Sequence, residues 1–451
     1  MAGGNFDRKA GKVRPGTYIN IESTRQEPIN KSNSGTVIFP LVNHSYGPEK
    51  EFIKLSCDAP DAAMEKLGYS IYDDNPGMLL VREAFKRAAE VIVYIPKQGA
   101  KASATAGGIT GKAKYGGSRG KDLSYSVVAN PIAGFDVAVH LKADTVSEYE
   151  GLNTIEELIA KDNAWIDFSG TGPLSAVVGT PLTGGADGVA TNADFIEYLD
   201  SAEGQRWKTM AFPLMPSGEV GDTVPALLET IKSKIQYLRE GAGKYRKAVV
   251  SGLNADYEGI INVTNSVVLK DGTALTPAQA TVWVAGVDAR ASITKSNTYE
   301  KYDGAVDIVG LKSHAEAVSA INAGEFFFSF SEAGDVVVEY DINTLVTFDK
   351  PKDRTYRKNR ILRVLDNFAD DLLLEFPPNK YDNSPTGWDV MEGIGRALLK
   401  QYEEAGAIKN VDYENDFLVD RSLSDGDETY FDIGLEPVDS SEKLFNTIKT
   451  R

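Results

Sequence analysis

The sequence predicts an α/β multidomain protein with an inserted β-rich domain, an α+β C-terminal domain and terminal strand arms. Three observations lead to this fold class. The chain has 451 residues, enough for about two to four domains of roughly 100–200 residues each. Strand and helix patterns alternate on both sides of residues 97–188, whereas that stretch holds 15 of the 42 glycines and only short alternating runs. After residue 341 two long helical patterns dominate.

Composition and charge exclude several classes of function. Apolar residues make up 42% of the chain and charged residues 25%, as in ordinary globular proteins. The formal net charge of −17 argues against a nucleic-acid partner, because binding to a polyanion depends on cationic side chains. No stretch approaches the roughly 20 apolar residues that span a bilayer, and the polar start lacks a signal peptide's apolar core. We therefore expect that the chain is synthesised in the cytosol and does not insert into a membrane.

Residues 1–22 are expected to form an N-terminal arm with a linker strand. The first 15 residues are polar and show no apolar periodicity, which is typical of a flexible segment. Residues 16–21 then alternate as a short strand does, through Thr17, Tyr18, Ile19 and Ile21. This strand could pair with the edge of a sheet in another subunit, or it could pack on its own domain.

Residues 23–96 and 189–340 are expected to form one α/β domain. The first part shows a strand at 36–39, a helix capped near Asp58 that ends at Gly68, a helix that starts after Pro76, and a strand at 91–95. The second part shows strands at 209–212, 248–250 and 260–263, then a hairpin from 326–330 to 336–340. Its helices begin with Pro225 in the first turn, with Thr276 and with the capping box of Ser313. The alternation favours a parallel sheet.

The C-terminal domain, residues 341–451, has an unusual charge order. Residues 350–363 hold seven Lys or Arg against one Asp, a net charge of +6. A helix follows, with apolar residues at Ile361, Leu365, Phe368 and Leu372 and four acids at its far end. A basic start and an acidic end oppose the helix dipole. Either a partner surface that uses these charges or a solvated charged face would explain this order.

The end of the chain combines acidic residues with a second strand arm. A helix is predicted from Thr386 to Gly406, and residues 411–442 then contain eleven acids against one arginine. Residues 429–435 alternate as a strand within this acidic segment. The last residues, 444–449, show a further short strand pattern with Leu444, Phe445 and Ile448 as its apolar members.

The sequence shows no arrangement of residues typical of an active site. The three histidines are far apart, and the single cysteine has no companion, so we expect no metal site. No Gly-x-Ser-x-Gly elbow is present, and the glycine-rich run 106–113 lacks the first glycine and final Ser or Thr of a phosphate loop. We therefore expect no catalytic residues and no cofactor.

Several segments, taken in order and spacing, are similar to one known family. They are residues 15–18, 285–289, 303–307, 341–345, 358–363, 405–408 and 436–444. With these segments the chain resembles the contractile tail sheath proteins of phages and related injection devices, of the Gram-positive myophage or R-type bacteriocin type. Residues 380–383 depart from the aromatic and glycine pattern of that family.

The resemblance implies a structural subunit and no enzyme. Subunits of such sheaths form six-fold rings that stack helically around an inner tail tube, and contraction drives the tube through a target envelope. The expected partners are further copies of the chain, the tube protein, and baseplate and tail terminator proteins. The particle would be a virion tail or a headless bacteriocin assembled in the bacterial host cytoplasm before lysis.

The resemblance also implies roles for parts of the chain. The α/β domain would have a subtilisin-like topology without the catalytic triad. The terminal arms would add strands to a sheet of neighbouring subunits. As a hypothesis, Lys358, Arg360 or Arg363 would face the tube and hold the extended lattice on it.

Two alternatives stay open at this point. An α/β hydrolase-like enzyme would explain the central domain, although its nucleophile is not found. A surface or glycan-binding module would explain the β-rich insert at 97–188, and it could coexist with a sheath role.

Overall fold

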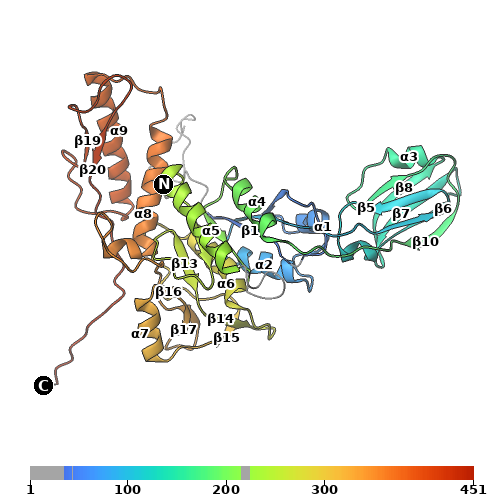
Figure 1. The fold of residues 1–451 in the computed structure, drawn as a ribbon, viewed down its shortest axis with the longest axis horizontal. Coiled ribbons are helices and arrows are strands. Elements are labelled where there is room, and N and C mark those ends of the chain that lie inside the picture. The colour runs from blue at the N-terminus through green and yellow to red at the C-terminus, as the bar shows by residue number, and fades with distance from the viewer. Residues whose placement is uncertain (1–34, 43, 215–223, 451) are drawn as a thin grey trace, which may run out of the picture.

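The computed structural model describes residues 35–42, 44–214 and 224–450. Figure 1 shows a central α/β body with a β-rich part at one end and two long helices at the other, from which the C-terminus extends alone. The strand predicted at 16–21, with Thr17, Tyr18, Ile19 and Ile21, lies outside the described residues. No helix among the described residues is long and apolar enough to cross a membrane.

A seven-stranded sheet organises the central body, in the order β16-β13-β12-β11-β1-β3-β2. All neighbours are parallel except the antiparallel pair β2–β3, so the predicted parallel sheet is confirmed. Strand β2 was not predicted, and it closes one edge of the sheet. The strands are β1 (Thr36–Pro40), β2 (Phe52–Ser56), β3 (Glu90–Tyr94), β11 (Thr209–Ala211), β12 (Lys247–Val250), β13 (Ile260–Val263) and β16 (Glu325–Phe326).

Helices cover both faces of this sheet, so its strands are buried on two sides. Along β1, Val37 and Phe39 face one core while Ile38 faces the other, because successive side chains of a strand point to opposite faces. The first core contains α1 (Ala62–Leu67), α2 (Pro76–Phe85) and α6 (Pro277–Arg290); the second contains α4 (Asn192–Ala202), α5 (Val224–Gln236) and the π-turn η3 (Tyr237–Gly241).

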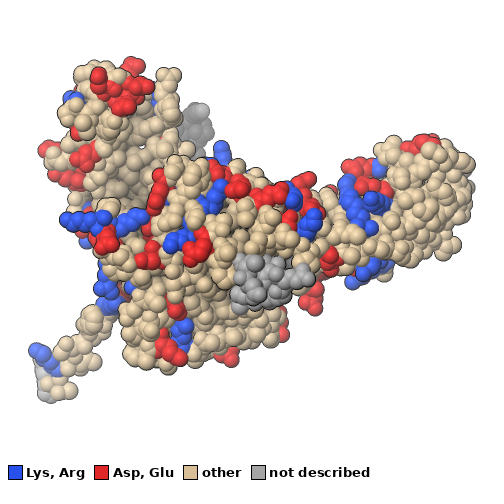
Figure 2. All heavy atoms as spheres, viewed as in Figure 1, with Lys and Arg blue, Asp and Glu red and all other residues tan. Residues whose placement is uncertain are grey.

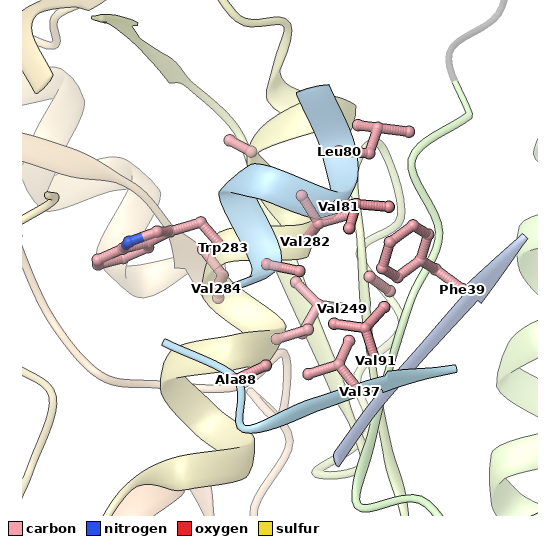
Figure 3. Packing of buried hydrophobic residues seen from close by; sticks show 14 of the residues in the cluster. Val37, Phe39, Leu80, Val81, Ala88, Val91, Val249, Val282, Trp283 and Val284 are labelled. Carbon is pink, nitrogen blue, oxygen red and sulfur yellow. The ribbon is translucent and has the colours of Figure 1, made fainter. Parts of the chain in front are cut away.

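Trp283 of α6 is fully buried in the first core. Figure 3 shows its ring on one side of α6, with Val37 of β1, Val91 of β3 and Val249 of β12 on the other side. Its ring stacks on Tyr302 with centroids 4.2 Å apart, and the Tyr302 hydroxyl donates a 2.6 Å hydrogen bond to Glu83. The same side holds α7 (His314–Asn322) and two small hairpins, β14 (Ser266–Leu269) with β15 (Ala305–Val309) and β17 (Phe328–Phe330) with β18 (Val336–Val338).

The insert is a separate pair of sheets with its own core. Tyr125 lies between them, because its ring packs edge-on against Phe168 and its hydroxyl donates to the carbonyl of Ile109. The three-stranded sheet is β4 (Ser103–Ala106), β5 (Ile109–Ala113) and β9 (Ile166–Ser169). The four-stranded sheet is β10 (Val177–Pro181), β6 (Leu123–Ala129), β7 (Phe135–Leu141) and β8 (Asp144–Leu152), with η1 (Ser118–Asp122) and α3 (Ile155–Ile159) beside them.

The C-terminal part consists of two helices and a short hairpin. Phe368 and Tyr402 meet edge-on between the helices, with centroids 5.1 Å apart. The second helix begins one residue before the predicted start, because the Ser384 side chain accepts from the Gly387 amide and caps it. The elements are η4 (Arg354–Arg357), α8 (Asn359–Glu375), α9 (Pro385–Glu404), β19 (Phe417–Val419) and β20 (Phe431–Ile433).

Three predicted elements differ in the structure. The helix expected near Asp58 begins only at Ala62, after a turn. The predicted hairpin run at 326–330 divides, because its first residues pair with β13 instead. Residues 444–449 form no strand within this chain, since a strand needs a hydrogen-bonded neighbour and the arm extends away from the body.

Two glycines of α9 provide a matched test of this packing. A Cβ at Gly395 would lie 2.2 Å from the Phe417 ring, whereas a Cβ at Gly393 would meet nothing within 4 Å. We expect Gly395→Ala to destabilise the C-terminal part by about 1–3 kcal/mol through overpacking. We expect Gly393→Ala to stabilise it by up to about 1 kcal/mol, because alanine favours helix. Urea unfolding of both variants measures the difference, and equal effects would contradict the helix–hairpin contact.

Candidate assembly site

The C-terminal arm presents apolar side chains to solvent. Leu444 is 75% exposed, and Phe445 and Ile448 are each 92% exposed. The structure therefore places the three residues predicted for this arm on an extended segment with no cover from the body of the chain (Figure 1). Exposed apolar side chains in an extended backbone are suited to pairing with a sheet edge of another molecule.

The root of this arm is fixed by ionic contacts. Lys358 donates to the carboxylates of Asp439 and Glu442 at 2.6 and 2.7 Å, and Arg360 donates to the Ser440 hydroxyl at 2.5 Å. Burial opposes the charge of Lys358, but the two carboxylates outweigh it and raise its pKa well above the usual value. The arm therefore leaves the body from a defined point at the start of α8.

These contacts give Lys358 and Arg360 a role that the sequence did not predict. Both were expected to face a tube, yet Arg360 is only 7% exposed and the Lys358 side chain is 21% exposed. Their charges are used within the chain, at the arm root.

Behind α8 lies a buried ionic cluster, centred on Asp288 of α6. Asp288 forms ion pairs with Lys247 of β12 and, at 3.3 Å, with Arg363 of α8, and it accepts a 2.8 Å hydrogen bond from Thr209. Arg363 also lies 3.5 Å from Asp341. Burial by itself raises the pKa of Asp288, but the charges of Lys247 and Arg363 outweigh it and lower that pKa to about 2.

A second row of contacts continues along α8. Arg239 of η3 holds Asp366 with two parallel hydrogen bonds of 2.9 and 2.7 Å. Lys208 donates to Asp370 at 3.0 Å and to Asn367 at 2.8 Å. The basic start and acidic end of this helix thus have a partner surface, and that surface is the α/β body of the same chain.

The predicted tube contact of Arg363 is not supported. Its side chain is 2% exposed, and its guanidinium is held by Asp288 and Asp341. A charge enclosed in this way cannot be presented at the surface of the chain. The physical reason is the helix period, because Asp366, Asn367 and Asp370 follow Arg363 by three, four and seven residues on the same face of α8. Those residues contact Arg239 and Lys208 of the α/β body, so the face that carries Arg363 is turned toward that body.

Sequence reasoning missed this cluster, although one signal for it was present. Asp288 is the single charged residue in the otherwise apolar run 280–289, and a lone charge there requires a buried partner. The identity of that partner could not be read from the sequence, because Lys247 and Arg363 are 41 and 75 residues away.

The hairpin β19–β20 offers a short sheet that further strands could extend. Its two strands pair only with each other among the described residues. Beside it is an apolar groove of about 270 Å³, lined by Leu372, Phe376, Phe417, Phe431 and Ile433 among others.

No site for a metal is found in the described parts of the chain, where no group of three or more His, Cys, Asp or Glu could hold an ion. His44 has a structural role. His44 bonds to Asn75 and to the Leu67 carbonyl, and burial lowers its pKa to about 4.

Three family models match consecutive parts of the chain. Residues 97–187 match the phage tail sheath protein beta-sandwich domain, residues 188–344 the phage tail sheath protein central domain, and residues 351–451 the phage tail sheath C-terminal domain.

Comparison with individual proteins agrees with these matches. The solved sheath tail protein from Desulfitobacterium hafniense is 36% identical, covers 95% of this chain and 98% of its own, and has a TM-score of 0.81. The phage-like element PBSX protein XkdK of Bacillus subtilis (strain 168) is 34% identical over the full length of both chains. The anti-feeding prophage helical sheath in the contracted state covers 98% of this chain and 100% of its own with a TM-score of 0.55, but at 11% identity it shows the shared fold alone.

Replacement of Asp288 tests the buried cluster. We expect Asp288→Asn to lower the free energy of unfolding by about 3–5 kcal/mol, because it leaves Lys247 and Arg363 buried without their shared carboxylate. The control is Asp389→Asn, which removes an ion pair with Arg421 whose side chains are 66% and 50% exposed. That variant should change stability by less than about 1 kcal/mol. Similar values for both variants in urea unfolding would contradict the cluster's role.

The pKa of Asp288 also predicts a pH dependence. Its folded pKa of about 2 lies below the value of about 3.9 for an unfolded Asp. Its contribution to stability is therefore complete above about pH 4 and is lost as the pH falls through about 2. Between pH 4 and pH 2 the wild-type chain should lose stability more steeply than Asp288→Asn, as measured by urea midpoints. Parallel slopes would count against the ionised carboxylate.

Proposed function

Because this chain belongs to the phage tail sheath protein family, we propose that it polymerises helically around an inner tail tube and contracts to drive the tube through a target cell envelope. It is a structural subunit of a contractile injection system. The observation that carries the proposal is the C-terminal arm, whose Phe445 and Ile448 are 92% exposed on a firmly anchored root. A polymer subunit needs such an element, whereas an isolated globular protein does not.

The two arms act as strand donors between subunits. The C-terminal arm, with Leu444, Phe445 and Ile448, adds to the hairpin β19–β20 of a neighbouring copy, where the apolar groove receives its side chains. The N-terminal arm, through Thr17, Tyr18, Ile19 and Ile21, does the same. Main-chain hydrogen bonds of this kind keep subunits joined while their bodies rotate about the arms.

The energy for contraction requires no nucleotide. It is stored when the subunits assemble in a metastable extended lattice, and it is released as they bury more surface in the contracted one. Support comes from the solved sheath of an anti-feeding prophage in the contracted state, which shares this fold.

Finer features of the assembly belong to the same proposal. They are six-fold symmetry, contacts with the tube, baseplate and tail terminator proteins, and assembly of a virion or bacteriocin tail in the host cytoplasm. Of the three cations predicted to face the tube, Lys358 keeps the most exposed side chain, at 21%. Three further points also stay predictions. They are the subtilisin-like arrangement of the α/β domain, the absence of enzyme activity, and the domain limits near residues 97, 188 and 341. Nothing in the described residues favours the hydrolase or glycan-binding alternatives.

Substitutions in the arm test this function. We expect the double variant Phe445→Asp, Ile448→Asp to fold but to form no long hollow tubes in electron microscopy, with or without tube protein, because charged side chains cannot enter an apolar groove. Removal of residues 1–22 should also abolish the tubes.

The matched control is the double variant Ile132→Asp, Val178→Asp. These side chains are each 94% exposed, as apolar as those of the arm, but they lie in the β-rich part. Tubes should persist in this control. Normal tubes from the arm variant, with the wild type also forming tubes, would contradict strand donation by this arm.

A further inference from the structure

A pocket of about 420 Å³ opens beside the arm root, between α7, η4 and the start of the arm. Its lining includes the apolar side chains of Val318, Ile321 and Ile342. It also includes four cations, Arg354, Arg357, Lys358 and Lys443, against one carboxylate, Asp439, which is paired with Lys358. The pocket is therefore suited to an acidic segment that also carries uncharged atoms.

One side chain in this pocket is buried without a partner. Arg357 is 7% exposed, and its Nε and Nη2 atoms make no hydrogen bond. No carboxylate in the described residues forms an ion pair with it, although the nearby cations Lys358 and Arg363 are both paired with carboxylates. Burial lowers the pKa of Arg357, which is the direction expected for a guanidinium that lacks an anion.

Such a group is costly to the isolated chain. A buried charge that has lost water and gained no partner destabilises the fold, and an ion pair between the guanidinium and a carboxylate reduces that cost. The geometry thus indicates a missing anion at Arg357.

The same domain carries an unpaired acidic tip at its other end. Asp425, Asp427 and Glu428 are exposed in one turn, and no ion pair to any of them is found within the described residues. Asn383 holds this turn at the start of α9 by donating to the carbonyls of Gly426 and Glu428 at 3.1 and 2.9 Å. Figure 2 shows carboxylates gathered at this far end of the C-terminal part, which contains α8 and α9.

The tip and the pocket cannot meet within one chain. The pocket lies at the start of α8, whereas the tip lies beyond the end of that helix, next to α9. Seventeen residues of α-helix separate the two ends by about 25 Å.

We propose that the acidic tip at residues 425–428 of a second copy of this chain enters the pocket, where a carboxylate pairs with Arg357. The proposal rests on the proposed function, since it names the partner segment at the arm root. The contact joins one end of the C-terminal domain in one copy to the opposite end of the same domain in another copy, so it is head-to-tail. A head-to-tail contact that does not close into a ring generates a helical polymer, which matches the assembly proposed above.

A double-mutant cycle on the full chain tests the contact. Arg357→Met keeps the apolar stem and removes the charge, so the monomer should unfold at the same or a higher temperature. The concentration at which tubes first form should rise about tenfold or more. Neutralisation of the tip by Asp425→Asn, Asp427→Asn and Glu428→Gln should have the same effect. The two changes together should do no more than either alone, because they remove the same contact.

A control of equal charge change is Asp144→Asn, Glu148→Gln and Glu150→Gln, which neutralises three exposed carboxylates on β8 and should leave tube formation unchanged. Additive effects in the cycle, or no effect of the tip variant, would overturn the proposal. Acetate and inorganic phosphate give a second measurement. If either anion raises the melting temperature of the wild-type monomer but not that of Arg357→Met, while the tip variant assembles normally, the proposal is also overturned. If the wild type forms no tubes even with tube protein, the proposed function itself fails, and this inference fails with it.

Discussion

The structure depends on the carboxylate of Asp288, which is shared by cations from two separate parts of the chain. Lys247 comes from the central sheet and Arg363 from α8, and both pair with it away from water. Such ion pairs add little net stability, because the desolvation of each charge offsets most of the attraction. Their effect is on geometry. A displaced α8 would leave these charges buried without partners, so the cluster holds the C-terminal part against the α/β body.

That fixed geometry gives the arm a defined origin. Arg363 is held from inside while Lys358, five residues earlier, holds Asp439 and Glu442 at the arm root. The arm beyond the root is free of the body, and its apolar residues have no cover. The molecule thus combines a rigid centre with an extended end, which is the division of roles that a polymer with moving subunits requires. Rigid bodies transmit force, and extended arms keep neighbours joined.

The sequence predicted elements well where the signal is local. The capping box of Ser313 and Glu316 starts α7 as expected, and the apolar runs at 248–250 and 260–263 form neighbouring parallel strands. Edge strand β2 was missed because it is only five residues long, although Ile53 and Leu55 are buried on either side of the exposed Lys54. The charges of α8 were read correctly as unusual, but their contacts with the α/β body of the same chain were not predicted.

These contacts were not predicted because the residues that make them are far apart along the chain. A helix with a basic start and acidic end requires partners, but the sequence does not say whether they belong to the same molecule. Asp366 meets Arg239 from 127 residues away, a contact that no local pattern encodes. The same limit applies to the terminal arms, because the partners proposed for them lie in another copy of the chain.

The most direct test of this account is a cryo-electron microscopy structure of the assembled polymer at a resolution that reveals side chains. The account predicts that residues 444–448 of one copy are hydrogen-bonded to the β19–β20 hairpin of another, with Arg363 still paired to Asp288 inside each copy. Arms folded back on their own chain, or α8 separated from the sheet, would contradict it.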